Sequence, residues 1–245
     1  MVNLLKADVR RLYRNIFFVA GCVLAFFITW YYTGNGASFG IQYTSDANHY
    51  MVFISAGVLV FFSIFPGVFQ TVEYSDGIIR NKIAIGRQQI HIYLSEYATL
   101  CIAMLTMIVC WLMGGLFGGA VMTVELLKYT VTMMLFSMAY AAIMTMICMR
   151  ITKVMVSAGL QIVVLQLGVN ATIMLYALSA ALDGTAGNIF KIMLNMFPIG
   201  QWFSNTSMVN MGTSLGFGSQ MVLSSIVIVL FLVLGTFRID QRDVK

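Results

Sequence analysis

Charged residues are scarce in this sequence. Only 9% of the 245 residues are Asp, Glu, Lys or Arg, whereas a soluble domain carries about a quarter. Proline is rare too, with 2 residues, while hydrophobic residues make up 60% of the chain. Few charges and long apolar stretches exclude an ordinary soluble domain. They predict an all-α membrane protein, because a helix satisfies its own backbone polar groups in lipid.

Motifs for catalysis are also missing. The sequence has no G-x-x-x-x-G-K-[ST] phosphate loop, no H-E-x-x-H and no G-x-S-x-G, and its only histidines are His49 and His91. The four cysteines lie in apolar stretches without a C-x-x-C spacing, so neither a disulfide framework nor a metal site is predicted. We therefore expect no enzyme activity, no metal and no cofactor in this chain.

Carboxylates are absent from the middle of every long apolar stretch. Proton-driven transporters usually keep an ionisable residue at membrane depth, and this chain has none there. Sodium coupling through carbonyl and hydroxyl oxygens stays open. The energy for uphill transport is therefore expected to come from outside the chain. The nine carboxylates are Asp8, Asp46, Glu73, Asp76, Glu96, Glu125, Asp183, Asp240 and Asp243.

Six apolar stretches are long enough to cross about 30 Å of hydrocarbon. The predicted spans are 16–33, 50–72, 97–121, 129–149, 155–182 and 221–237. Pro66 predicts a kink in the second span. Between the fifth and sixth spans, residues 186–210 are largely apolar and broken at Pro198, so we expect two short helices that dip into the outer leaflet.

Lys and Arg set the orientation. With the amino terminus in the cytosol, twelve cations lie inside and only Lys128 and Lys191 lie outside, as the positive-inside rule requires. This distribution accounts for the net charge of +5 without a nucleic-acid partner. Both termini are therefore predicted to be cytoplasmic. The inner cations are Lys6, Arg10, Arg11, Arg14, Arg80, Lys82, Arg87, Arg150, Lys153, Arg238, Arg242 and Lys245.

The stretch 73–96 is an island of charge between the second and third spans. Ser75 or Asp76 could cap a helix there. Isoleucines at 79, 83 and 90 recur at helical spacing on one face, with Arg80, Arg87 and His91 on another. Gly86 interrupts the pattern, so we expect a short amphipathic helix at the membrane surface, a bend, and then the next span. An interfacial helix with no further role is one interpretation of this stretch.

A second interpretation comes from a resemblance. The run D-G-I-I-R-N-K-I-A-I-G-R (76–87), followed by I-Y-L-S-E (92–96), resembles the first cytoplasmic loop of ABC-2 type permeases, most of all the bacterial antimicrobial-peptide and peptide-toxin exporters. The resemblance implies one transmembrane domain over residues 1–245 in a bacterial cytoplasmic membrane. It also implies that this loop is a coupling helix that docks on a dimer of separate ATPase subunits, which hold the ATP and Mg²⁺, and that a second permease copy or paralogue completes the complex.

Residue roles follow from the same resemblance. Arg80, Lys82 and Arg87 would contact the ATPase groove. Gly77 and Gly86 would permit the local geometry, and Glu73 and Glu96 would pair with cations of the loop or with the amino-terminal arginines. The whole set of implied coupling residues is Glu73, Asp76, Gly77, Arg80, Asn81, Lys82, Gly86, Arg87, Tyr93 and Glu96.

Two sets of residues within the spans have two interpretations each. Gln166 and Asn170 are four residues apart in the fifth span, with Thr172 close by; they could form interhelical hydrogen bonds or line a translocation path at a subunit interface. The overlapping G-x-x-x-G pairs of residues 114–119 could pack within the subunit or at a dimer contact.

The cargo is the least determined feature. The 19 methionines and the many aromatic residues could line an adaptable groove for amphipathic or antimicrobial peptides, moved for export or self-immunity. Drug, lipid or ion efflux by the same architecture is an alternative. A carrier or channel that needs no ATPase, and a membrane scaffold or sensor, are further alternatives. The sequence leaves the direction of transport open.

Overall fold

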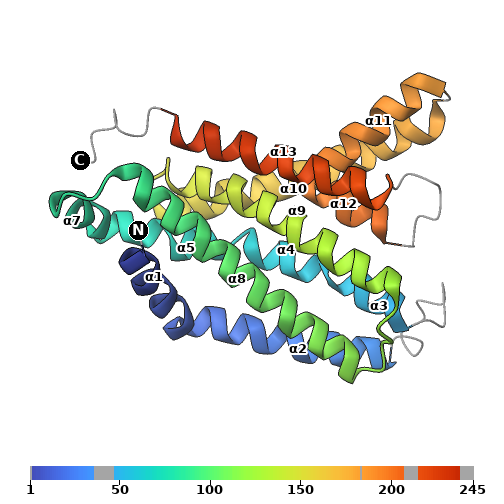
Figure 1. The fold of residues 1–245 in the computed structure, drawn as a ribbon, viewed down its shortest axis with the longest axis horizontal. Coiled ribbons are helices and arrows are strands. Elements are labelled where there is room, and N and C mark those ends of the chain that lie inside the picture. The colour runs from blue at the N-terminus through green and yellow to red at the C-terminus, as the bar shows by residue number, and fades with distance from the viewer. Residues whose placement is uncertain (1, 36–46, 183, 207–214, 238–245) are drawn as a thin grey trace.

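A computed structural model describes residues 2–35, 47–182, 184–206 and 215–237, and every regular element in these ranges is a helix (Figure 1). The predicted all-α class is confirmed for this part of the chain. The helices are α1 (Val2–Arg14), α2 (Ile16–Asn35), α3 (Ala47–Ile54), α4 (Ala56–Phe62), α5 (Phe65–Phe69), α6 (Thr71–Ser75), α7 (Ile78–Ala84), α8 (Gln89–Phe117), α9 (Val124–Cys148), α10 (Val154–Ala181), α11 (Gly184–Met196), α12 (Pro198–Asn205) and α13 (Phe217–Thr236).

Six helical stretches of the described chain are long and apolar enough to cross a membrane, as predicted. They are α2, the run α3–α6 over Ala47–Glu73, α8, α9, α10 and α13. The main difference lies in α8, which begins at Gln89 rather than near Tyr97. No proline or glycine interrupts it before Gly114, so the helix runs from the predicted surface stretch directly into the third span.

The second span is broken more often than predicted. Pro66 was expected to produce a single kink, but breaks occur at Ser55, at Ser63–Ile64 and at Gln70. The hydroxyls of Ser55 and Ser63 each donate to the carbonyl three residues earlier, at 2.6 Å, and so compete with the backbone ladder of the helix. Pro66 removes one further backbone donor at the start of α5.

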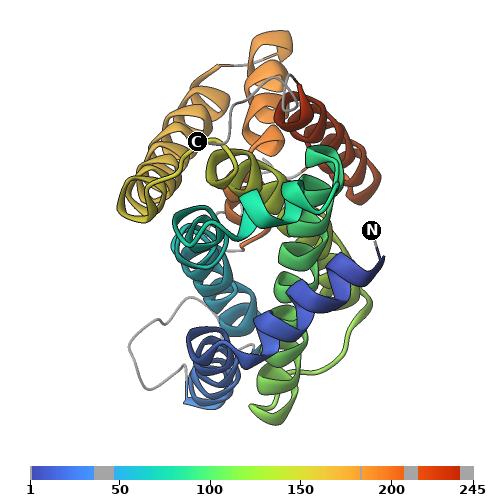
Figure 2. The same cartoon turned by 90° about the vertical axis from the view of Figure 1, so that its left-hand side faces the viewer.

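Helix α9 lies at the centre of the bundle. In the most apolar 18-residue stretch of α9, 67% of the residues are buried. The corresponding stretches of α2, α10 and α13 have 22%, 17% and 17% of their residues buried. Helix α9 contacts α8, α10, α13 and helices α4 and α5 of the second span, which lie around it in Figure 2. The outer helices therefore present large apolar faces to their surroundings.

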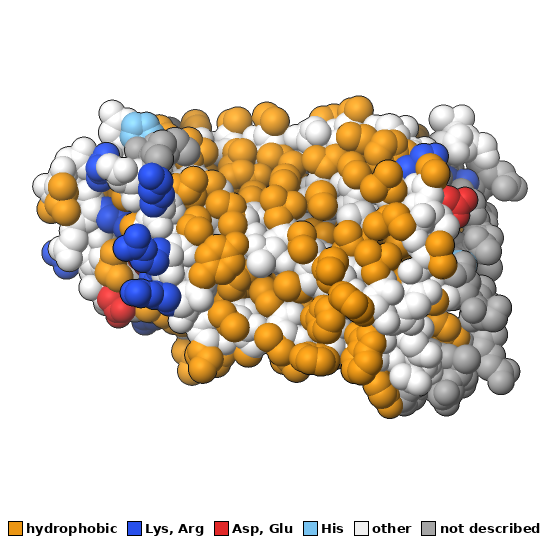
Figure 3. All heavy atoms as spheres, turned by 60° about the horizontal axis from the view of Figure 1, so that its bottom comes forward, with side chains coloured by type: hydrophobic (Ala, Val, Ile, Leu, Met, Phe, Trp, Pro, Cys, Tyr) orange, Lys and Arg blue, Asp and Glu red, His pale blue; other side chains and the backbone are white. Residues whose placement is uncertain are grey.

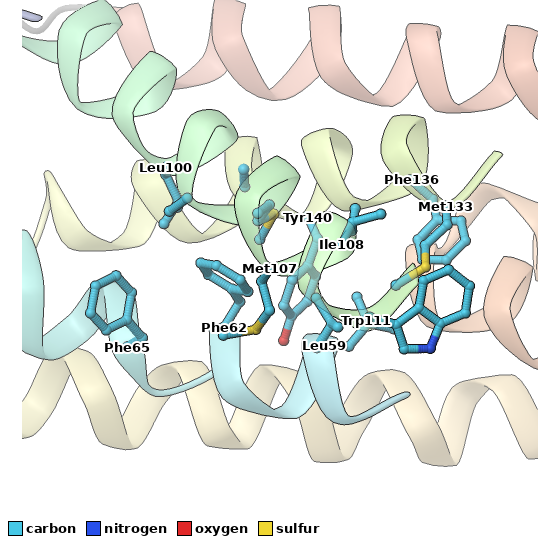
Figure 4. Close-up of a cluster of buried hydrophobic side chains, with 14 of the residues drawn as sticks. Leu59, Phe62, Phe65, Leu100, Met107, Ile108, Trp111, Met133, Phe136 and Tyr140 are labelled. Carbon is cyan, nitrogen blue, oxygen red and sulfur yellow. The ribbon is translucent and has the colours of Figure 1, made fainter. Parts of the chain in front are cut away.

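Aromatic and methionine side chains fill the centre. Leu59, Phe62 and Phe65 of the broken second span meet residues of α8 and α9 such as Met107 and Phe136 (Figure 4). The indole nitrogen inside this core is paired: Trp111 Nε1 donates to Met51 O at 2.9 Å, as buried indole groups require. The result is a close-packed interior in which one added methyl group disturbs the packing.

Charge gathers at the two ends of the molecule and leaves an apolar surface between them (Figure 3). Helices α1 and α7 lie at one end, where Lys and Arg side chains predominate (Figures 1 and 3). Glu125 and Lys128 belong to the start of α9 at the other end. An apolar surface between two charged ends is typical of a multi-pass membrane protein. The predicted cytoplasmic carboxyl terminus lies outside the described residues.

Two short helices follow the fifth span, as predicted for residues 186–210. They are α11 and α12, separated at Phe197, with Pro198 opening α12. The last predicted positions, 207–210, lie outside the described residues. Buried amides tie the pair together: Gln201 Nε2 donates to Asn195 O at 2.7 Å, and Gln220 Nε2 of α13 donates to Asn195 Oδ1 at 3.0 Å.

The glycines of α8 pack within the subunit. A Cβ atom on Gly118 would lie 2.7 Å from Trp30 O, and one on Gly114 would collide with Phe26 O, so both face the backbone of α2. Gly115 faces the Met51 side chain of α3. Of the two interpretations of the G-x-x-x-G pairs, the structure therefore favours intramolecular packing.

Replacing Gly118 with alanine should lower the free energy of unfolding by about 1–3 kcal/mol, because the added methyl group forces α2 and α8 apart. Thermal unfolding in detergent micelles measures the change. Gly159→Ala on the exposed face of α10 is the matched control, since a Cβ there meets nothing within 4 Å. Equal melting temperatures for both variants would contradict the α2–α8 contact.

Candidate functional site

Two glycines shape the turn that contains α7. Gly77 precedes the helix at φ 70°, and Gly86 follows it at φ 85°. A Cβ on either would meet nothing within 4 Å, so glycine is needed for the left-handed backbone and not for space. The expected short helix, bend and following span are therefore present. Gly77, and not Ser75 or Asp76, occupies the N-cap position, which corrects the expected cap.

Helix α7 has a buried face and an exposed face. Ile79 is buried and packs with Ile92, Tyr93 and Met149, which tie α7 to α8 and to the end of α9. The opposite face is open to the surroundings at the tip of the molecule (Figure 1). We call this face, together with the turn that follows the helix, the α7 knob, and define it by Arg80, Asn81, Ile85 and Arg87, all of which are exposed.

Lys82 points inward, away from the α7 knob. Its Nζ donates to Glu73 Oε2 at 2.7 Å, to Asp8 Oδ1 at 3.1 Å and to Glu96 Oε1 at 3.4 Å. The three carboxylates come from α6, α1 and α8 and are almost fully buried. One ammonium group therefore joins four helices. The sequence grouped Lys82 with Arg80 and Arg87, but the structure separates it from them.

Arg11 completes this charge cluster from α1. Its guanidinium pairs with Glu73, donates to Phe69 O at 2.5 Å and lies 4.0 Å from the centroid of the Phe69 ring. Burial lowers the pKa of Arg11, while the Glu96, Asp8 and Asp76 carboxylates act in the opposite direction. The predicted pairing of Glu73 with an amino-terminal arginine is present. Below, "charge cluster" means Asp8, Arg11, Glu73, Lys82 and Glu96.

The charge cluster contains three carboxylates and two cations. Asp8 has a second partner, since Ser95 Oγ donates to its Oδ2 at 2.7 Å. Glu96 is the least satisfied member, because its Oε2 has no hydrogen-bond partner among the described residues. A buried carboxylate oxygen without a partner is destabilising. With three carboxylates against two cations, one negative charge of the cluster is uncompensated, and we assign it to the ionised form of Glu96.

Replacing Glu96 with glutamine should change the free energy of unfolding by less than about 1 kcal/mol, and in the stabilising direction, because it removes the uncompensated charge. The matched control is Glu73→Gln, which breaks the pairs with both Arg11 and Lys82 and should cost about 1.5–3 kcal/mol. Chemical denaturation in micelles at neutral pH measures both variants. A larger loss for Glu96→Gln than for Glu73→Gln would contradict this assignment.

The charge cluster is suited to holding helices together rather than to catalysis. Oxygens of Asp8, Glu73 and Glu96 lie within 4.8 Å of one another, a spacing that a metal ion could bridge. The Lys82 ammonium group already contacts all three carboxylates. We therefore assign the central position among these carboxylates to Lys82.

The other predicted coupling residues differ in how deeply they are buried. Tyr93 is fully buried, and its hydroxyl lies where a Cβ on Gly235 of α13 would be, so it contributes to packing and not to the α7 knob. Asp76 is exposed beside Gly77. Glu73 and Glu96 are buried in the charge cluster. Of the ten predicted residues, the structure places Arg80, Asn81 and Arg87 together where a partner could reach them.

The polar residues of the fifth span lie in different environments. Gln166 and Asn170 share an exposed face of α10, and Gln166 Nε2 donates to Asn170 Oδ1 at 3.4 Å. Thr172 is buried and therefore apart from them. Interhelical hydrogen bonding belongs instead to Gln161, which accepts from Gly67 N at 3.1 Å and donates to Cys148 Sγ at 2.8 Å. Gln166 and Asn170 make no interhelical bond within the described chain.

Asp8 is the member of the charge cluster that sequence reasoning missed. The sequence predicts no partner for this carboxylate near the start of the chain. Its position offered a signal, since Leu5, Val9 and Leu12 lie on one side of the amino-terminal helix and Asp8 falls within that stripe. A carboxylate on the apolar face of an amphipathic helix needs a buried partner, and Lys82 and Ser95 are those partners here.

Comparison with known proteins adds no family assignment: no protein-family model matches this chain, and no curated protein matches it significantly. Function is therefore inferred from the residues and their arrangement. The two features that stand out are the exposed α7 knob and the charge cluster directly behind it.

Proposed function

We propose that this chain is the membrane-spanning subunit of an ATP-driven exporter in a bacterial cytoplasmic membrane, and that a separate ATPase docks on the α7 knob. The two-sided structure of α7 carries the proposal. One face offers Arg80, Asn81 and Arg87 to a partner, while Lys82 on the other face is bonded to three helices of the membrane domain. A helix that only covered the membrane surface would not need such a tether.

The charge cluster would transmit movement. A push on α7 acts through Lys82 on α1, α6 and α8 together, because its three carboxylate partners belong to these helices. Helix α6 continues the second span, whose breaks at Ser55, Ser63 and Gln70 offer places for it to bend. ATP and Mg²⁺ belong to the partner in this proposal, and closure of the ATPase pair would drive the spans between inward-open and outward-open arrangements.

The exposed face of α10 supports a path for amphipathic cargo. Gln166 and Asn170 lie near the middle of this span among exposed apolar residues such as Leu167 and Met174. Exposed amides at that depth are unfavourable against lipid alone. We propose that a second permease copy or paralogue covers this face, and that the two subunits line a path for amphipathic or antimicrobial peptides. Helices α11 and α12 would close its outer end.

Purification from the native membrane, followed by reconstitution into liposomes, tests the proposal. We expect an ATP-binding cassette protein to co-purify with the chain, and its ATP hydrolysis to rise when amphipathic peptides are added. Transport or conductance by the chain alone would instead identify a self-contained carrier or channel. Neither a partner nor transport would point to a scaffold or sensor.

A further inference from the structure

An apolar groove of about 510 Å³ opens on the side of the bundle. Helix α2 forms one wall with residues such as Leu24 and Ile28, and α3–α5 form the other with residues such as Phe61. Met107 and Trp111 of α8 form its floor. Large apolar residues on both walls are partly exposed, among them Leu24 at 57% and Val60 at 49%.

The groove has the length and polarity of an acyl-chain site. It runs from Asn15, at the start of α2, to Ile28 and Trp111, and thirteen residues of helix span about 20 Å. Among the described residues that line it, only Asn15 and Thr29 have amide or hydroxyl side chains, and Thr29 Oγ1 donates to Ala25 O at 2.6 Å. A polar ligand would find no partners along the walls, whereas a hydrocarbon chain needs none.

Two cations of α1 precede Asn15, the residue that lines the inner end of the groove. Arg14 directly precedes Asn15, and Arg10 lies one helical turn earlier on the same side of α1. Both are exposed, and neither forms an ion pair with a described residue, whereas Arg11 between them is held in the charge cluster. Figure 3 shows Lys and Arg side chains gathered at one end of the apolar surface. This pairing of charge and groove complements an anionic amphiphile.

Gly57 keeps the groove open. It lines the groove in α4, and a Cβ built on it would meet no atom within 4 Å. Gly21 on the opposite wall has no such space, since a Cβ there would lie 2.5 Å from the ring of Phe61. The Cβ atom of a larger residue at position 57 therefore meets no steric obstacle on this wall of the groove.

We propose that this groove binds one acyl chain of an anionic phospholipid from the inner leaflet, with its phosphate held by Arg10 and Arg14. The site is separate from the α7 knob and does not depend on the proposed ATPase partner. A bound lipid would fill the space between α2 and the broken second span.

Fluorescence of Trp111 tests the site. In the Trp30→Phe/Trp202→Phe background, Trp111 is the single tryptophan, because the sequence has 3. The protein is reconstituted in phosphatidylcholine bilayers that contain a small fraction of phosphatidylglycerol or phosphatidylcholine with brominated acyl chains. Brominated phosphatidylglycerol should quench Trp111 at about a tenfold lower fraction than brominated phosphatidylcholine, and Arg10→Gln/Arg14→Gln should remove this preference. Equal quenching by the two lipids in the unsubstituted groove would overturn the proposal.

A filled groove provides the second arm. Gly57→Phe should abolish quenching of Trp111 by both lipids, whereas Gly159→Phe, at an equally open position on α10, should leave it unchanged. Native mass spectrometry should show one phosphatidylglycerol retained by the parent protein and lost from Gly57→Phe. The proposal would be overturned if quenching persists in Gly57→Phe. It would also be overturned if the parent protein shows no quenching because a peptide or a second subunit fills the groove. If Gly57→Phe does not fold, the test rests on two other measurements: quenching of Trp111 in the Arg10→Gln/Arg14→Gln variant, and the phosphatidylglycerol retained by the parent protein in native mass spectrometry.

Discussion

Replacing Lys82 with methionine should lower the free energy of unfolding by about 3–5 kcal/mol, because it leaves buried carboxylates without their cation. Lys82 is the only described residue that contacts Asp8, Glu73 and Glu96 together. Its loss leaves Arg11, which pairs with Glu73 from the far side of the cluster. Differential scanning fluorimetry in micelles measures the melting temperature. Limited proteolysis around α7 reports whether this helix separates first.

Lys6→Met is the matched control, since Lys6 is exposed on α1 and should tolerate the same change within about 0.5 kcal/mol. A triple variant, Lys82→Met with Asp8→Asn and Glu96→Gln, separates charge from shape. It should recover much of the lost stability, because it removes the charges of Asp8 and Glu96, the two carboxylates that Lys82→Met leaves without a cation. An unchanged melting temperature for Lys82→Met would show that Lys82 does not hold α7.

If a separate ATPase docks on the α7 knob as proposed, reversing the charge of the knob should abolish stimulation of its ATP hydrolysis. Arg80 and Arg87 are exposed, and neither belongs to the charge cluster, so Arg80→Glu/Arg87→Glu should fold normally. Arginines at the centre of an interface often contribute about 2 kcal/mol each, so losing both weakens docking about a thousandfold. ATP hydrolysis by the reconstituted complex, titrated with the permease variant, measures the effect.

Lys153→Glu provides the control, because it reverses an exposed charge in the short connection between α9 and α10. It should leave ATPase stimulation near the parent level. Equal stimulation by the Arg80/Arg87 variant and the parent chain would refute docking at the α7 knob. A stability measurement on the same samples separates lost docking from lost folding.

Hydropathy predicted the spans well, because each must be long and apolar enough to cross hydrocarbon whatever it packs against. The second span shows the limit of this reasoning. Its length was predicted, but a single kink at Pro66 was expected, and the breaks lie at Ser55, Ser63–Ile64 and Gln70. Ser55 and Ser63 lie where helices end, and their hydroxyls donate to carbonyls three residues earlier. Serine also occurs inside many unbroken helices, so its presence in the sequence did not predict these breaks.

The candidate site was predicted in part. Gly77 and Gly86 marked the turn correctly, since the left-handed backbone strongly favours glycine. The faces of α7 were harder to assign, because Lys82 follows Arg80 and Asn81 and looks equally exposed in the sequence. Only its partners from α1, α6 and α8 show that it points inward.

By itself the sequence determined that the chain is helical, that it has six stretches able to cross a membrane, and that a charged turn separates the second from the third. These properties depend on local composition and on the length of hydrocarbon to be crossed. Tertiary structure alone decided that Asp8 meets Lys82 across 74 residues, that Gly118 packs on α2, and that Gln166 and Asn170 stay exposed. These properties depend on which helix faces meet, and a face is defined only once its neighbours are in place.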